Sequence, residues 1–222
     1  MRAATIFLIC ALMLAGQYPT FSQEKIVVVS PDEQDPKVLQ DAKSKLERTR
    51  VQFERDSKLY RRGSISAQQH KVSRLQFRVA KLELQLLESP ERAIQIRRSI
   101  AKLNVDFERD RFESFKKLHQ SGSLSELRYQ RQKFRFKIAD IGYRQASGKL
   151  SGTDAKLMAA RTQHQLTSKE LELAMALLRQ RSITRSSFDE MRKRDADAAK
   201  AVREIEEQQK KARETIRNST KT

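Results

Sequence analysis

The side chains best suited to chemistry are three histidines, His70, His119 and His164, and a few close pairs of acids. No two histidines stand at the i, i+4 spacing that would place them on one helix face as metal ligands. The acidic pairs, such as Asp106 with Asp110, lie among Lys and Arg residues, as on a charged helix surface. We therefore expect each histidine to be a solvated helix residue. The chain is predicted not to be an enzyme, with no catalytic residue, no metal site and no cofactor.

The single cysteine, Cys10, lies in an apolar stretch near the N-terminus. This stretch follows Arg2, is too short to span a bilayer comfortably, and has the layout of a secretory signal peptide. Thr20 and Ser22 are small residues two apart, so cleavage is expected after Ser22. Residues 1–22 are thus predicted to direct the chain to the periplasm or the exterior; an uncleaved anchor is the alternative. The mature chain then has no thiol, which excludes disulfides and thiolate metal sites.

A short Gly-Ser motif recurs along the rest of the chain at a fixed interval. Gly63-Ser64-Ile65-Ser66 returns 59 residues later as Gly122-Ser123-Leu124-Ser125, and after 59 more as Arg181-Ser182-Ile183-Thr184. Glycine readily takes the left-handed conformation that ends a helix, and a Ser or Thr three residues on can begin the next one. Ser66 with Gln69 has the spacing of a capping box. The motif predicts three turns, each joining two helices, although Arg181 stands where the first two turns have glycine.

Apolar residues at alternating three- and four-residue steps flank each turn. Leu75, Val79 and Leu82 follow the first turn, and Ile96, Ile100 and Leu103 precede the second. We expect an all-α fold of three tandem antiparallel coiled-coil hairpins, six long helices in all, with every turn at one end. A closed bundle and an open row both remain compatible with this pattern. The predicted boundaries are a tether over 23–36 and hairpins over 37–89, 90–148 and 149–222.

The net charge of +18 is spread evenly over the three hairpins. Such an excess is typical of a solvated, helix-supporting surface, and it also suits an acidic partner such as anionic lipid head groups, acidic glycans or nucleic acid. Export disfavours nucleic acid as the normal partner. An intracellular nucleic-acid coiled coil would require the N-terminal signal to be inert.

The first hairpin also carries a spacing that is known from one protein family. Arg55 is followed four residues later by Leu59 and eleven residues later by Ser66. In this spacing the segment resembles the α-hairpin of periplasmic adaptors (membrane fusion proteins, HlyD-like) of efflux pumps and type I secretion systems. The resemblance covers the hairpins only, because the chain lacks the strands that would build the lipoyl and β-barrel domains of a whole adaptor.

The resemblance implies a docking role for the hairpin tip on an outer-membrane channel, through Arg55, Leu59 and Ser66. The second hairpin keeps Leu118 and Ser125 but has Ser114 in the arginine place, and the third keeps only Leu177 and a hydroxyl. The leading hypothesis is an exported adaptor or scaffold of the cell envelope whose partner is such a channel or a transporter component. A basic helical protein that binds acidic polymers or anionic membranes is the alternative. Assembly with further copies of the chain remains open.

Overall fold

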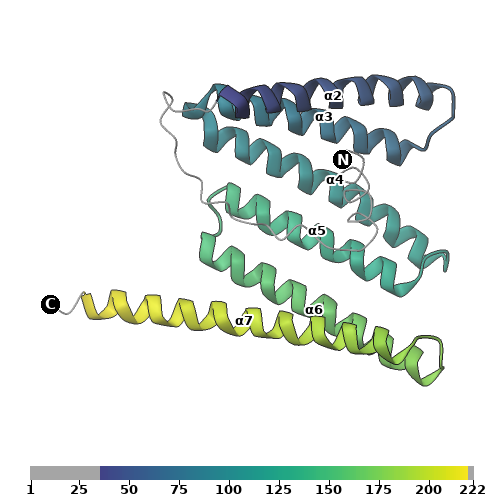
Figure 1. The fold of residues 1–222 in the computed structure, drawn as a ribbon, viewed down its shortest axis with the longest axis vertical. Coiled ribbons are helices and arrows are strands. Elements are labelled where there is room, and N and C mark those ends of the chain that lie inside the picture. The colour runs from purple at the N-terminus through teal and green to yellow at the C-terminus, as the bar shows by residue number, and fades with distance from the viewer. Residues whose placement is uncertain (1–35, 220–222) are drawn as a thin grey trace, which may run out of the picture. The chain divides into compact units, whose positions relative to one another are not determined.

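The computed structural model describes residues 36–219, which form helices joined by short turns. The predicted signal peptide and nearly all of the predicted tether lie outside the described residues. The helices are α2 (Pro36–Arg61), α3 (Ala67–Glu88), the single-turn 3-10 helix η2 (Pro90–Arg92), α4 (Ala93–Gln120), α5 (Glu126–Ala146), α6 (Gly152–Arg179) and α7 (Arg185–Ser219) (Figure 1). The prediction of an all-α fold with six long helices is confirmed.

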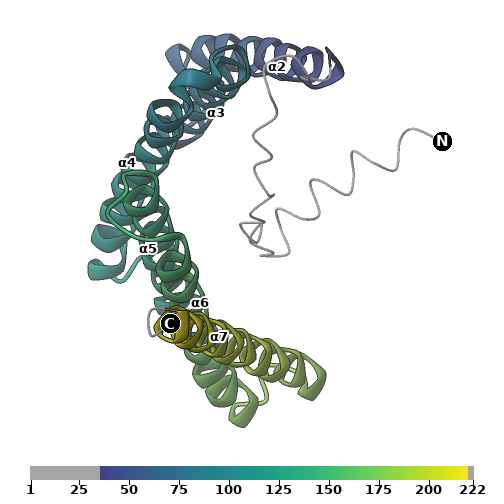
Figure 2. The same cartoon turned by 90° about the vertical axis from the view of Figure 1, so that its left-hand side faces the viewer.

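The six helices pack as consecutive antiparallel pairs. Helix α4 packs against α5 and α6 against α7, while α3 with α4 and α5 with α6 join one hairpin to the next. Stacked rings and an ion pair from Lys45 to Glu83 join α2 to α3. Within residues 36–219, the helices that share extensive contacts are all neighbours in the chain, so they form a row and not a closed bundle. The second view of the ribbon follows them in that order (Figure 2).

This antiparallel order places the three hairpin turns at one end of the row. The turns after α2, α4 and α6 lie together on the right of Figure 1, and the connections after α3 and α5 lie on the left. We call the first end the turn end and define it by residues 57–71, 116–130 and 175–189. The other is the opposite end. None of the helices described has an apolar run long enough to cross a membrane.

The strongest apolar stripes of α3 and α4 lie between two hairpins, although the sequence pattern predicted them inside the hairpins. Lys71 of α3 pairs with Asp110 of α4 at 3.2 Å, which identifies the two faces that meet. Helical spacing places the main stripe of each helix on the same face as its charged residue: Leu75, Val79, Leu82 and Leu86 with Lys71, and Ile96, Ile100, Leu103 and Phe107 with Asp110.

The second stripe of α3 is the one that contacts α2. The ring of Phe77 stacks on Phe53 with 5.6 Å between the centroids, and Ala80 is buried on the same side. An inner helix is covered on two sides, so it needs two apolar stripes. The sequence reveals both stripes but does not reveal which neighbour each one meets, and this is why the seam was assigned wrongly.

The outermost helices replace the apolar stripe with polar residues on their outer faces. Positions of α2 that lie 59 residues before the main stripe of α4 are all exposed: Lys37, Asp41, Ser44 and Arg48. The equivalent positions of α7, 59 residues after Phe134, Ile138 and Ile141 of α5, are also exposed and charged: Lys193, Asp197 and Lys200. Polar outer faces of this kind keep the ends of a helical array in water.

Candidate partner-binding surface at the turn end

The three turns share one backbone geometry. The carbonyl groups of Leu59, Leu118 and Leu177 accept hydrogen bonds of 2.8–2.9 Å from the amides of the residues five positions later. This bond, together with a left-handed residue just before the donor, is the Schellman motif that ends many helices. Gly63 and Gly122 have φ of 71° and 73°, and Arg181 adopts the same conformation at φ 57°. The sequence repeat is therefore a repeat of backbone structure, including the turn that lacks glycine.

The hydroxyl residues after each turn occupy the N-cap position. The Ser66 hydroxyl accepts a hydrogen bond from the Gln69 amide at 3.1 Å, which confirms the predicted cap. Thr184 accepts from the Ser187 amide at 3.2 Å. Ser125 has the same extended backbone, φ −66° and ψ 148°, but its side chain makes no cap hydrogen bond. Ser66 is thus already engaged within its own hairpin, whereas the Ser125 hydroxyl makes no such bond.

The other residues singled out by the resemblance lie at the ends of α2 and α4. Arg55 is exposed on α2, and Leu59, one helical turn later, is half-buried. Leu118 is 45% exposed on α4. The fold brings Leu59 near Ser66 across the first turn and Leu118 near Ser125 across the second. The two sets belong to different hairpins, side by side at the turn end.

Columns of stacked rings lie beneath the first two turns. In the first hairpin the rings follow one another as Phe77, Phe53, His70 and Tyr60, with centroids 5.6, 5.6 and 4.8 Å apart. In the second hairpin the order, with spacings of 5.6, 5.8 and 4.6 Å, is Phe136, Phe112, Tyr129 and His119. Each position lies 59 residues from its equivalent, with histidine and tyrosine exchanged. The rings come alternately from the two helices, so each column fastens its hairpin just below the turn.

Two histidines are therefore structural residues, and the expectation of solvated side chains was wrong for them. His70 and His119 are both half-buried in these columns. The His70 Nε2 lies 3.1 Å from the Ser57 hydroxyl. The His119 Nε2 lies 3.0 Å from a carboxylate oxygen of Glu126, and its Nδ1 lies 3.1 Å from the carbonyl oxygen of Leu124. Sequence reasoning missed the columns because it compared histidine only with histidine, although the 59-residue spacing of all four ring positions was visible.

Most of the cations around the turns are free of ion pairs. Eight of them are exposed, and none forms an ion pair with another residue of the described part of the chain: Lys58, Arg61, Arg62, Lys116, Lys117, Arg179, Arg181 and Arg185. Each lies near the C-terminal end of a helix or just beyond it, where the helix dipole favours positive charge. The Schellman bonds already satisfy carbonyl groups at these ends, so the cations remain free to meet an anion.

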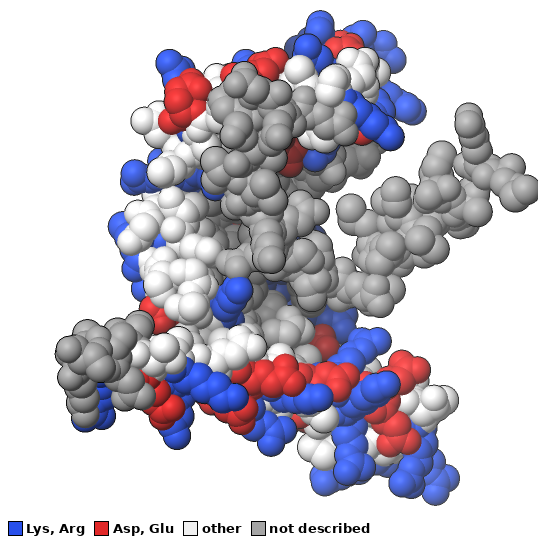
Figure 3. Space-filling view, turned by 60° about the vertical axis from the view of Figure 1, so that its left-hand side comes forward, with Lys and Arg blue, Asp and Glu red and all other residues white. Residues whose placement is uncertain are grey.

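Charge is polarised along the helices, although it is even along the chain. The turn end holds ten Lys or Arg and only two Asp or Glu. The corresponding part of the opposite end, residues 36–43, 83–97, 142–156 and 212–219, holds nine and six. Figure 3 shows the mixed pattern along α7, where red and blue side chains alternate. The sequence count by repeat concealed this polarity, because each repeat contains both ends.

Large apolar side chains are exposed beside these cations. Tyr60 is 43% exposed on α2, Leu118 is 45% exposed on α4, and Met175 and Leu177 are 40% and 39% exposed on α6. All four lie in the last turns of helices that lead into hairpin turns. The turn end therefore offers unpaired cations and apolar side chains together, a combination that suits an anionic partner with an apolar component.

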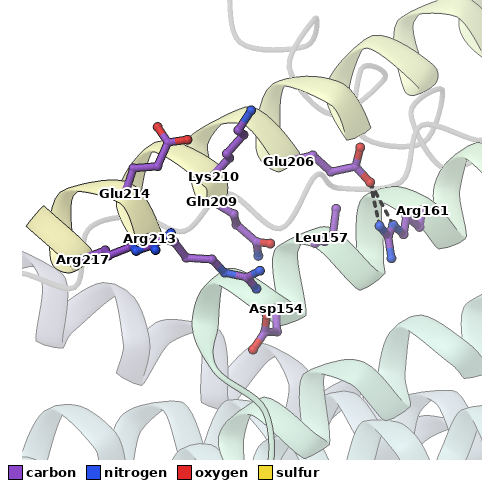
Figure 4. A pocket seen from close by; sticks show the side chains of 9 residues that line it. All are labelled: Asp154, Leu157, Arg161, Glu206, Gln209, Lys210, Arg213, Glu214 and Arg217. Carbon is purple, nitrogen blue, oxygen red and sulfur yellow. Dashed lines mark hydrogen bonds and ion pairs between the residues drawn. The ribbon is translucent and has the colours of Figure 1, made fainter.

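An open groove of about 510 Å³ lies between α6 and α7, toward the opposite end. Figure 4 shows Arg161 reaching Glu206, with Nη2 2.7 Å from the carboxylate oxygen, while Gln209 lies between Leu157 and Arg213. The Gln209 amide nitrogen is buried without a hydrogen-bond partner among the described residues. Four cations and three carboxylates line the groove, so it has little net charge with which to attract a ligand.

Comparison with known proteins finds no relative. No protein-family model matches the chain, and neither a curated protein nor a solved structure matches it. No cluster of three or more side chains that could hold a metal ion lies within residues 36–219. The role of the turn end is therefore inferred from the residues of this chain alone.

Proposed function

We propose that the chain is an exported, non-catalytic adaptor or scaffold protein of the cell envelope that contacts its partner through the turn end. The observation that carries this proposal is the gathering of three turns of one backbone geometry at a single end of the row. Repetition of a surface motif at one end favours binding, because several weak contacts to one target add up to a stable attachment.

The proposed partner is a membrane channel or a transporter component, as the resemblance to adaptor hairpins suggests. Arg55 supports this role because it is exposed on α2 and reaches solvent one helical turn before Leu59. Leu118 supports it as an exposed apolar residue of the second turn. Ser66 contributes differently, since its hydroxyl caps α3 and therefore fixes the shape of the tip. The coiled-coil character of the hairpins is part of the same proposal.

Substitution of the first tip tests this function. The variant R55D/L59A/S66A is expected to lose cross-linking and co-purification with an envelope protein that the unchanged chain captures in intact cells. Loss of the Ser66 cap alone costs about 1 kcal/mol, so the variant must be compared with one that loses an equal cap. The variant R144D/L150A/S151A at the opposite end provides this control, because the Ser151 hydroxyl caps α6 by accepting from the Asp154 amide.

The two variants decide between docking and destabilisation. Retained capture by the control and lost capture by the tip variant support the proposal, provided that both give the circular dichroism of a folded helical protein. Equal capture by all three chains, or the absence of any captured envelope protein, would contradict it.

A further inference from the structure

We propose that the turn end binds the surface of an anionic lipid bilayer, with the hairpins standing on the membrane on their three turns. This inference rests on the proposed function in one respect, since both place the contact surface at the turn end. It adds a partner of stated chemistry and requires no second protein.

Charge supports a lipid surface as the partner. All three turns contribute exposed cations, including Arg62, Lys117 and Arg181, and none of these three is neutralised by an acid within residues 36–219. Clustered Lys and Arg residues are attracted to anionic head groups within about a Debye length of the membrane. The opposite end has nearly balanced charge, so the attraction also orients the molecule with its turns toward the bilayer.

The exposed apolar side chains favour a bilayer over a soluble polyanion. Leu118 and Leu177 occupy equivalent positions of the second and third turns, and each is at least 39% exposed. Tyr60 is exposed at the first turn, where an amphipathic ring suits the boundary between head groups and hydrocarbon. An acidic glycan or a nucleic acid would attract the cations but would gain nothing from burying the leucines. A bilayer satisfies both sets of residues.

Co-sedimentation of the full chain with vesicles tests the inference. Vesicles of phosphatidylcholine with phosphatidylglycerol supply the anionic surface, and vesicles of pure phosphatidylcholine report binding through any other part of the chain. Neutralising one cation per turn, in R62Q/K117Q/R181Q, is expected to weaken binding to the anionic vesicles about tenfold. The control K43Q/K149Q/K156Q removes the same charge from exposed positions of the opposite end and is expected to weaken binding less than about threefold.

A second pair of variants separates lipid from polyanion. The change L118A/L177A is expected to weaken vesicle binding about threefold and to leave heparin binding unchanged, because only the bilayer buries the leucines. The matched change V51A/I94A removes apolar side chains that are more exposed, 56% and 77%, but lie outside the turn end, and it is expected to have no effect on either.

Three results would overturn the inference. Equal losses for the two triple variants would mean that net charge alone drives the binding. Sensitivity to the turn cations without any effect of the leucine changes on vesicles would identify a soluble polyanion as the ligand. Absence of binding to anionic vesicles would exclude a lipid surface. None of these results depends on capture of an envelope protein, so the docking function and the lipid contact fail or succeed separately.

Discussion

The first two hairpins and the third share a backbone but differ in what holds their helices together. In the first two, a column of four rings lies beneath the turn. The equivalent positions of the third hairpin are Leu171, Leu178, Phe188 and Asp195. Asp195 accepts hydrogen bonds from the hydroxyls of Thr167 at 3.0 Å and Ser168 at 2.7 Å. One repeat has thus exchanged an aromatic contact for a small polar cluster without changing its fold.

The difference shows which part of the repeat is essential to the shape. The turn bond from Leu177 to Ser182 survives in the third hairpin even though Arg181 replaces glycine in the left-handed position. The side chains between the helices are free to change as long as each exchange leaves no buried polar group unpaired. The third hairpin is therefore expected to open first, because it has both a strained turn residue and a polar core position.

Removing the central ring of a column should have the largest effect. Phe112 stacks on both Tyr129 and Phe136 and is half-buried, so F112A is expected to lower the free energy of unfolding by about 3 kcal/mol. The equivalent change L171A in the third hairpin should cost about 2 kcal/mol. Urea denaturation measures both, and hydrogen exchange should locate the faster opening in α4 and α5. A loss for F112A no greater than that for L171A would remove the distinction between the hairpins.

Breaking the polar cluster should have the next largest effect. D195A leaves the hydroxyls of Thr167 and Ser168 without their acceptor and is expected to lower stability by about 2 kcal/mol. The control D197A removes an exposed acid of the outer face of α7 and should change stability by less than about 0.5 kcal/mol. Hydrogen exchange in α6 and α7 is the readout. Similar behaviour of the two variants would mean that Asp195 is only a surface charge.

Exchanging the turn residues should move the hairpins in opposite directions. R181G relieves a left-handed non-glycine residue and is expected to raise stability by about 1 kcal/mol, while G122A should lower it by a similar amount. A methyl group at Gly122 would meet no atom within 4 Å, so backbone strain is the only penalty. Thermal unfolding compares the two variants. A neutral or destabilising R181G would show that the guanidinium makes a compensating contact.

Reordering a column should have the smallest effect. The double change Y60H/H70Y gives the first hairpin the ring order of the second and is expected to stay within about 0.5 kcal/mol of the unchanged chain. Each single change disturbs one stacked pair and should cost about 1 kcal/mol, so the two changes are coupled. A double-mutant cycle measures this coupling. Additive losses would show that the exchange of His and Tyr between hairpins is coincidental.

The sequence predicted the repeat and its turns because these depend on local chemistry. The interval between Gly63 and Gly122 determines the turn positions, and Ser66 and Gln69 predict a cap that the structure contains. Features that require two helices were harder to predict. The stripe of Leu75 and Val79 was visible, but whether it faced α2 or α4 depends on the order of packing.

The candidate surface was only partly predictable for the same reason. Leu118 and Ser125 were placed correctly near a tip, but the polarity of charge emerged only when alternate helices were superposed in one row. Counting Lys and Arg by repeat averages the two ends of every helix, so Arg62 and Glu88 of one hairpin cancel although they lie at opposite ends. His70 and His119 showed no common register until tyrosine was admitted as their equivalent.

The polar outer faces of α2 and α7 also limit how copies of the chain can assemble. One copy cannot prolong the row of another by stacking, because Arg48 and Lys193 would have to leave water without an apolar face to replace it. Fibre growth is thereby discouraged, and every molecule brings the same fixed number of feet to its target. Firmer attachment then requires several molecules to gather on one site, which makes occupancy depend steeply on local abundance.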